Sequence, residues 1–245
     1  MSVATVAGIP IRVHWSLVGL MGLYFAFALI TAGMAETLEA TSVVVALFAS
    51  VVLHELGHAL AARNYGIRTA HITLYPFGGI AAITRAPATP FQELFIALAG
   101  PAVNLFLATL FFSLWTVSGA WLALAIAALN LIMGVFNLFP AYPMDGGRVL
   151  RALLVDRYGW VGASRIAMRV GRIFAWLFIG VGLVGFVPSL VLVGGFLLFA
   201  LAAERRRMEQ MVALRLWREH VPFTGMGPAP ARRWSRARGP QPYSG

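Results

Sequence analysis

The chain has 245 residues, of which 60% are apolar and 11% are charged. Soluble domains carry roughly 45–50% apolar and about 25% charged residues, so this composition excludes an ordinary water-soluble domain. The absence of cysteine excludes disulfide frameworks, thiolate metal ligands and cysteine nucleophiles. The net charge is +10 and every basic residue is arginine, so the placement of the arginines must decide between nucleic acid and membrane as a partner.

Six apolar segments are long enough to cross a bilayer, since about 30 Å of hydrocarbon needs roughly 20 helical residues. They cover residues 13–34, 41–62, 93–117, 120–138, 168–187 and 188–203. The sequence therefore predicts an all-α polytopic membrane protein with about six transmembrane helices.

Residues 66–84, between the second and third predicted helices, follow a different pattern. They are rich in β-branched and aromatic residues, alternate imperfectly and contain the turn signal Gly78-Gly79. Open strand edges are not tolerated in lipid unless other protein covers them. We therefore expect a short membrane-associated β-hairpin at this point of the chain.

The distribution of the arginines predicts the orientation of the protein in the membrane. With six helices and the N-terminus in the cytoplasm, the outside loops contain Glu36 and Glu39 but no arginine. All 19 arginines then fall on the inner side, at helix edges or in the tail. This distribution follows the positive-inside rule, so we expect a multi-pass membrane protein with both termini cytoplasmic. The lipid bilayer thus accounts for the net charge, and no nucleic-acid partner is expected.

The composition changes at Glu204. Residues 1–203 are expected to form a membrane-embedded domain. Residues 204–221 are expected to form a cytoplasmic amphipathic juxtamembrane helix, and residues 222–245, which are rich in Arg, Pro and Gly, a disordered tail.

The second predicted helix contains the sequence His54-Glu55-Leu56-Gly57-His58. Helix positions i and i+4 share a face, so both imidazoles can bind one Zn²⁺ ion while Glu55 stands beside it as the general base. Ionisable side chains inside an apolar helix cost about 2.5 kcal/mol or more each to insert. We therefore favour a functional role over a polar cluster that only joins helices.

A catalytic zinc ion usually has three protein ligands and one open position. The candidates for the third ligand are Glu93, Asp145 and Asp156, with His14 and His71 as nitrogen alternatives. Asp145 stands out because it lies in an irregular stretch of prolines and glycines that can carry a carboxylate back to the metal. It can also simply cap the helix that follows, so the local sequence leaves both interpretations open.

Two motifs in this order resemble the site-2 protease family of intramembrane zinc metalloproteases. They are the His54–His58 sequence and the pattern N-x-x-P-x-x-P-x-D-G at 137–146, and the likeness extends over roughly residues 8–205. The chain is most similar to the compact prokaryotic branch that includes the sporulation pro-sigma-factor processing protease. Many members of that branch carry C-terminal cystathionine-β-synthase-type domains, which we expect this protein to lack. The resemblance also implies a prokaryotic cell membrane as its location.

The resemblance implies that His54, His58 and Asp145 bind one catalytic Zn²⁺ ion and that Glu55 is the base. The implied activity is that of a zinc metalloendopeptidase, which hydrolyses a peptide bond in or near the transmembrane segment of a single-pass membrane protein. A regulatory membrane protein is a further expected partner.

Three asparagines lie in the third and fourth predicted helices. The resemblance implies that Asn137 contacts substrate and that Asn104 is a polar residue near the site. Both are candidate substrate-binding residues, since either amide can donate a hydrogen bond to the developing oxyanion. The alternative for both is hydrogen bonding between helices, which is also the interpretation of Asn130.

Two other functions compete with the protease. One is a zinc or proton transporter that uses the same ligands, and the other is an inactive membrane adaptor. A single ligand motif and a single broken segment argue against a transporter, which often contains inverted repeats and paired broken helices. The intact set of ligands and base argues against an adaptor.

Overall fold

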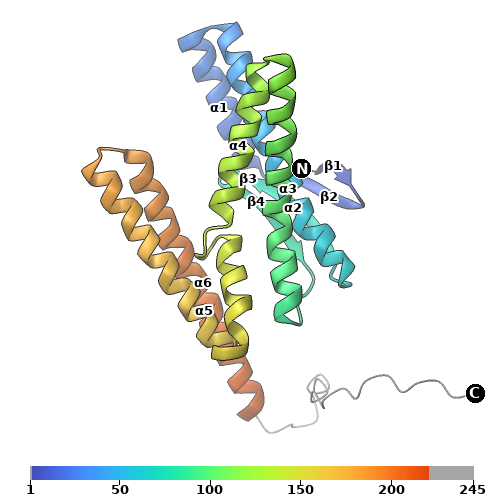
Figure 1. Cartoon of the computed structure of the whole chain (residues 1–245), viewed down its shortest axis with the longest axis vertical. Helices are drawn as coiled ribbons and strands as arrows, with labels where there is room; N and C mark the ends of the chain where they lie inside the picture. Colours follow the sequence, from blue (N-terminus) through green and yellow to red (C-terminus); the bar gives the residue numbers. More distant parts are fainter. Residues whose placement is uncertain (1, 221–245) are drawn as a thin grey trace, which may run out of the picture. The chain divides into compact units, whose positions relative to one another are not determined.

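The computed structural model describes residues 2–220, with side chains described as far as residue 213. The described residues up to Arg205 form one compact unit, and residues 206–220 belong to a second. Figure 1 shows the elements. They are β1 (Ser2–Val6), β2 (Ile9–Val13), α1 (Trp15–Ala32), α2 (Met34–Asn64), β3 (Thr69–Tyr75), β4 (Gly78–Ile83), α3 (Pro90–Ser118), α4 (Trp121–Asn137), α5 (Asp145–Val184) and α6 (Pro188–His220).

The helices confirm the polytopic membrane fold. Among the described residues, five helices are long and apolar enough to cross a membrane, namely α1, α2, α3, α5 and α6, and the 17-residue α4 is a shorter apolar helix. Each of the six predicted segments thus falls in its own helix. Outward-facing apolar side chains are highly exposed, for example Ile30 at 85% and Val117 at 88%. Such exposure is costly in water and is expected of a surface in contact with lipid.

The predicted hairpin is present as β3 and β4, and it belongs to a larger sheet. The strand order is β1-β2-β3-β4, with antiparallel pairs at both ends and a parallel pairing of β2 with β3 in the middle. The turn lies at Pro76 and Phe77, two residues before the predicted position, because Tyr75 pairs with Gly78 to close it. Strands β1 and β2 were not predicted, because two five-residue strands give little periodic signal and β3, the partner of β2, lies far along the chain.

Helix α5 is broken once. Gly159 has φ 66° and ψ 168°, a conformation that favours glycine, and it separates a first helical part from the apolar second part. Helix α6 continues to His220 through the predicted juxtamembrane helix. The predicted disordered tail, residues 222–245, lies outside the described residues.

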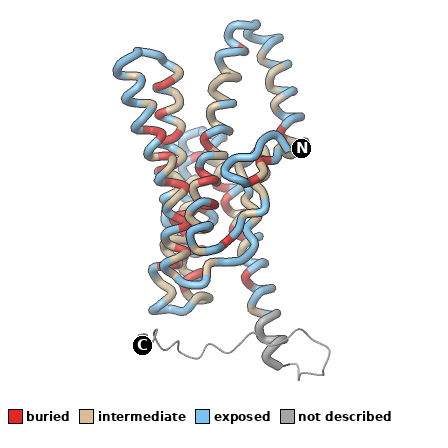
Figure 2. The backbone as a smooth tube through the Cα atoms, turned by 90° about the vertical axis from the view of Figure 1, so that its right-hand side faces the viewer, coloured by how far each residue is buried: buried red, intermediate tan, exposed pale blue. Residues whose placement is uncertain are grey.

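Buried residues gather where α2, α3, α4 and the start of α5 pack together and where α2 meets the sheet, while the side chains that face outward are exposed (Figure 2). The sheet contributes Ile72, which is fully buried, and packs it with Leu56 and Ala59 of α2. Polar residues are also found in this interior, among them Asn104 and Asn130, both 0% exposed. Buried polar groups need hydrogen-bond partners, because leaving them unpaired is costly. Polar side chains at membrane depth are typical of functional sites, so we expect a site in this interior.

Candidate metal centre

Helix α2 places His54 and His58 one turn apart on the same face. They are 6% and 8% exposed, and their rings meet edge to face with centroids 4.7 Å apart. Helix α3 approaches them closely at two glycines. A Cβ at Gly57 would lie 2.8 Å from the carbonyl oxygen of Ala99, and a Cβ at Gly100 would lie 2.6 Å from His58 Cε1. A larger residue at Gly100 would push the imidazoles aside, and a larger residue at Gly57 would push α3 away from α2.

The segment between α4 and α5 folds back and delivers Asp145, the first residue of α5. Glycines follow at positions 146 and 147, where an added Cβ would collide with the main chain of residues 138–142. The Tyr142–Pro143 peptide bond is cis. Asp145 is 8% exposed, and Arg148 lies 3.7 Å from its Oδ1 atom. A carboxylate that follows His54 by 91 residues is thereby brought to the face of α2.

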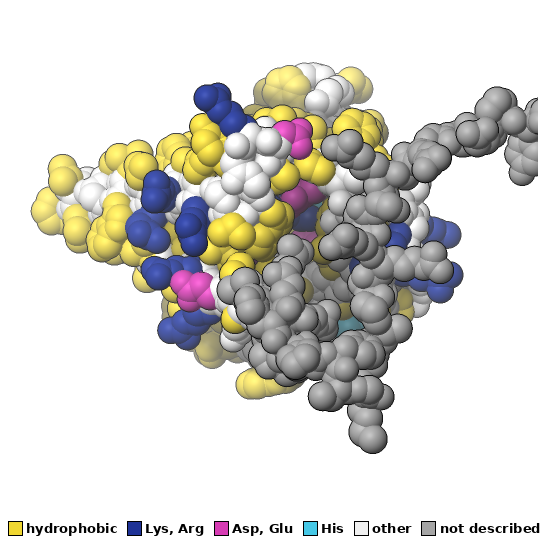
Figure 3. Space-filling view, turned by 90° about the horizontal axis from the view of Figure 1, so that it is seen from below, with side chains coloured by type: hydrophobic (Ala, Val, Ile, Leu, Met, Phe, Trp, Pro, Cys, Tyr) yellow, Lys and Arg dark blue, Asp and Glu magenta, His cyan; other side chains and the backbone are white. Residues whose placement is uncertain are grey.

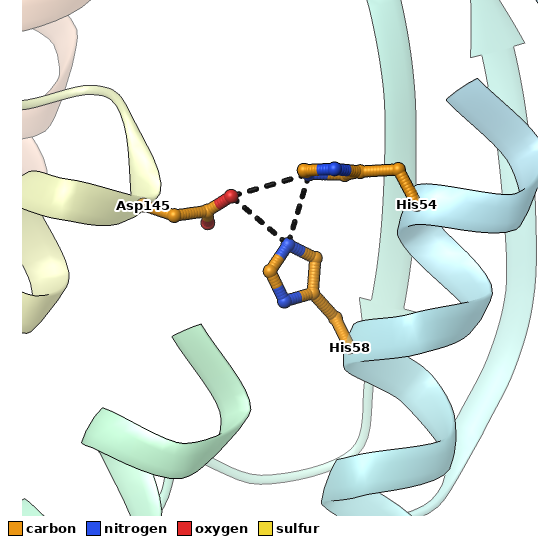
Figure 4. A group of neighbouring side chains, drawn as sticks. All are labelled: His54, His58 and Asp145. Atoms are coloured by element: carbon orange, nitrogen blue, oxygen red, sulfur yellow. Dashed lines mark hydrogen bonds and ion pairs between the residues drawn. The ribbon is translucent and has the colours of Figure 1, made fainter. Parts of the chain in front are cut away.

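Three donor atoms converge on one point (Figure 4). Asp145 Oδ2 lies 3.2 Å from His54 Nε2 and 3.0 Å from His58 Nε2, and the two Nε2 atoms are 3.1 Å apart. The other ring nitrogens are engaged elsewhere. His54 Nδ1 meets Asn104 Oδ1 at 2.7 Å, and His58 Nδ1 meets the carbonyl oxygen of Ile96 at 2.6 Å.

These contacts decide what the cluster can hold. A ring nitrogen that meets an oxygen acceptor carries the proton, so each Nε2 is left with a lone pair. Two lone pairs and a carboxylate that face one another within 3.2 Å repel unless a cation lies between them. The buried set can therefore hold a metal ion. Two imidazoles and one carboxylate are a ligand set of catalytic zinc sites, and the residues fit that ion.

Glu55 lies between the two histidines on α2 and faces the sheet. A Cβ at Gly79 of β4 would lie 2.7 Å from Glu55 Cγ, so only glycine lets the strand pass this closely. Strand β4 is the last in the sheet, and its outer edge has no partner strand among the described residues. An open strand edge therefore runs directly past the side chain that the sequence predicts as the base.

Glu93 has a partner other than a metal. It is 6% exposed in the first turn of α3 and forms an ion pair with Arg151 of α5. The Arg151 guanidinium also lies 5.3 Å from the ring centroids of Tyr142 and Trp160. Burial raises the pKa of the Tyr142 phenol, so this ring is neutral beside the ion pair. The pair fastens the start of α5 to α3, and sequence reasoning missed it because its members are 58 residues apart.

The remaining ligand candidates lie away from the metal centre. Within the described part of the chain, the set already named is the one group of three or more such side chains close enough to share an ion. His14 caps α1 and stacks on Tyr75 with ring centroids 4.7 Å apart. Asp156 is exposed on α5, and His71 lies on β3. The structure thus brings Asp145, rather than any alternative, to the two histidines.

The two asparagines of the predicted site differ in placement. Asn104 is fully buried, and both ends of its amide are engaged, with His54 at one end and Asn130 at the other. It therefore serves His54 in this structure rather than lying open to a substrate. Asn137 is the last residue of α4 and donates to the carbonyl of Met133 at 3.0 Å. Its predicted contact with substrate stays a prediction.

Comparison with known proteins gives a consistent set of similarities. Residues 42–121 and 116–178 match Peptidase family M50. The chain is 36% identical to a zinc metalloprotease of Methanocaldococcus jannaschii, over 83% of this chain and 60% of that protein. It is 35% identical to the putative zinc metalloprotease Rip3 of Mycobacterium tuberculosis, over 81% of this chain and 56% of that protein.

Two further similarities concern the architecture. The solved site-2 protease from Methanocaldococcus jannaschii matches with a TM-score of 0.64 and 32% identity, over 83% of this chain and 94% of that one. Stage IV sporulation protein FB of Bacillus subtilis is 27% identical over 52% of this chain and 45% of that protein. The chain spans 60% or less of the length of these three curated relatives. The matches agree with the resemblance drawn from the two motifs.

Proposed function

Because the chain belongs to peptidase family M50, we propose that it is an intramembrane zinc metalloendopeptidase that cleaves a membrane-anchored protein in or near its transmembrane segment. The observation that carries the proposal is the convergence of His54, His58 and Asp145 inside apolar helices. Ionisable groups at membrane depth are costly, and a buried donor set that fits a catalytic metal accounts for them.

The roles of the residues follow from their positions. His54, His58 and Asp145 would hold the zinc ion, which when bound supplies a Lewis acid that polarises the scissile carbonyl and acidifies water. Glu55 lies next to two of these ligands, so its carboxylate accepts a proton from the attacking water and then passes a proton to the leaving amine. Asn137, at the end of α4, is the proposed contact for the substrate main chain.

The sheet supports a mode of substrate binding. Peptide bonds within a helix are shielded, so a transmembrane substrate must extend before it is cut. The open edge of β4 can pair with an extended segment and satisfy its main-chain groups inside the bilayer. Gly79 brings this edge against Glu55, so a substrate strand added to β4 would pass close to the base.

We place the site toward the cytoplasm, with the protein in a prokaryotic cell membrane and both termini inside. Glu36 lies in the first turn of α2 and Arg63 in its last turn, at opposite ends of the helix. Figure 3 shows one face of the molecule, on which arginine side chains and a few acidic ones lie among apolar side chains. The opposite charges at the two ends of α2 support the orientation given by the positive-inside rule.

The test is Glu55→Gln in the full chain, with zinc content measured beside cleavage of a single-pass reporter. The amide keeps the shape but accepts no proton, so we expect retained zinc and a loss of cleavage of about 10²–10⁴-fold. Asp156→Asn, an exposed carboxylate on α5, is the matched control and should cleave normally. Full cleavage by a zinc-loaded Glu55→Gln variant would refute the assigned role. Zinc flux through proteoliposomes with an intact reporter would instead favour a transporter.

A further inference from the structure

We propose that Asn130 and Asn104 form a hydrogen-bonded relay that holds the proton of His54 on Nδ1, so that Nε2 is free to bind the metal. This rests on the proposed function, since it assumes that His54 is a zinc ligand. Both asparagines are positioning residues, and neither has to touch substrate. The relay joins α4 to α3 and α3 to α2 through side chains that are 0% exposed.

The far end of the relay is fixed by main-chain carbonyls, which can only accept hydrogen bonds. Asn130 Nδ2 lies 2.9 Å from the carbonyl oxygen of Ile126 and 2.9 Å from Ser50 Oγ. The Ser50 hydroxyl donates its one proton to the carbonyl oxygen of Ala46 at 2.9 Å, so it must accept from Asn130. Both neighbours therefore require the NH₂ group of Asn130 on their side, and its Oδ1 must point the other way.

The orientation of the Asn130 amide in turn sets the orientation of the Asn104 amide. Asn130 Oδ1 lies 3.3 Å from Asn104 Nδ2, so the NH₂ group of Asn104 faces Asn130 and its Oδ1 faces His54. Asn104 Oδ1 then accepts from His54 Nδ1 at 2.7 Å. The proton is thereby held on Nδ1, and the Nε2 lone pair is directed at the point where it meets Asp145.

His58 also carries its proton on Nδ1, and here a main-chain carbonyl fixes the proton without an amide in between. His58 Nδ1 meets the carbonyl oxygen of Ile96, which admits only a donor. An asparagine amide has no such preference, because it can present either end. Without Asn130, the amide of Asn104 could turn its NH₂ group toward His54 and favour the wrong tautomer. In the present structure, turning the Asn104 amide round would place its Oδ1 atom against Asn130 Oδ1 and its NH₂ group against the Nδ1 proton of His54. Both contacts are buried, so the repulsion is unfavourable away from water.

The experiment measures zinc affinity of the purified full chain by competition with a chelator. Asn130→Leu removes both the donor and the acceptor group of the amide. It should weaken zinc binding by about 10-fold or more, as is typical when the hydrogen-bond partners behind a metal ligand are lost. Asn130→Asp, when protonated, can still donate to Ile126 and accept from Asn104, so it should restore most of the affinity. Ser50→Ala leaves the Ile126 anchor in place and should bind zinc almost as the wild type does.

A double-mutant comparison separates the relay from a packing role. In the Asn104→Leu background, the change Asn130→Leu should have no further effect on zinc affinity, because the connection to His54 is already broken. A packing role would give additive losses and would lower the affinity of Ser50→Ala as well. The absorption bands of bound Co²⁺ give a second readout, and they should shift in the same way in both single Leu variants.

Thr37→Val is the control, since Thr37 is also 0% exposed but lies about 25 Å along α2 from His54. It should leave zinc affinity and the Co²⁺ bands unchanged. Wild-type zinc affinity in a folded Asn130→Leu variant would overturn the relay. Failure of the wild-type chain to bind zinc at all would overturn the proposed function instead, so the two failures are distinguishable.

Discussion

Gly100→Ala tests whether the close approach of α3 to the histidines is required for metal binding. An added Cβ would lie 2.6 Å from His58 Cε1 and 2.8 Å from His54 Cε1, and closer still to His58 Nε2. Ordinary contact begins near 3.4 Å, so the nearer Cε1 atom must retreat by about 0.8 Å. Metal-ligand distances tolerate only about 0.2 Å, so this displacement is some four times too large for the site.

We therefore expect Gly100→Ala to reduce zinc affinity by at least about 100-fold, measured by chelator competition on the purified chain. Overpacking of this kind costs roughly 1–3 kcal/mol, so the thermal stability of the metal-free protein should fall only modestly. Gly195→Ala on α6 is the matched control, because an added Cβ there meets nothing within 4 Å. It should bind zinc normally. Normal zinc affinity in Gly100→Ala would refute the packing argument for this site.

Three further perturbations follow from the same geometry. Asp145→Asn keeps the shape but removes the negative charge, and it should lower zinc affinity by about 10-fold or more in the same competition assay. Gly79→Val places a side chain against Glu55, so reporter cleavage should fall at least about tenfold while zinc content stays normal; an equal loss of zinc would contradict this. Arg151→Met leaves the buried Glu93 carboxylate unpaired and should destabilise the protein by about 3–5 kcal/mol in thermal or denaturant unfolding. Adding Glu93→Gln should recover much of that loss, and no recovery would argue against the ion pair as the cause.

The helices were predictable because their signal is local. An apolar run of about 20 residues reports its own environment whatever it packs against. All six predicted segments fall in helices, although α4 has only 17 residues. The pair His54 and His58 was equally predictable, since the helical repeat alone puts positions i and i+4 on one face. The hairpin of residues 66–84 was found by its composition, with the turn misplaced by two residues.

The rest depended on contacts between distant segments. From the residues alone Asp145 was one of five candidates for the third ligand, and the resemblance then pointed to it. The fold of residues 138–144 brings it to the two histidines. The N-terminal strands were missed because β2 pairs with a strand some sixty residues later. Asn130 had no motif around it, yet the structure connects it through Asn104 to His54.

By itself, the sequence determined that this protein spans a membrane and that one of its helices carries two histidines and a glutamate at metal-site spacing. Only the tertiary structure showed that Asp145 lies against the two histidines, that the Asn104 amide meets His54, and that β4 passes Glu55. The physical reason is that side-chain spacing within a helix follows from the helical repeat. The distance between side chains on different helices is set by the packing of the whole chain.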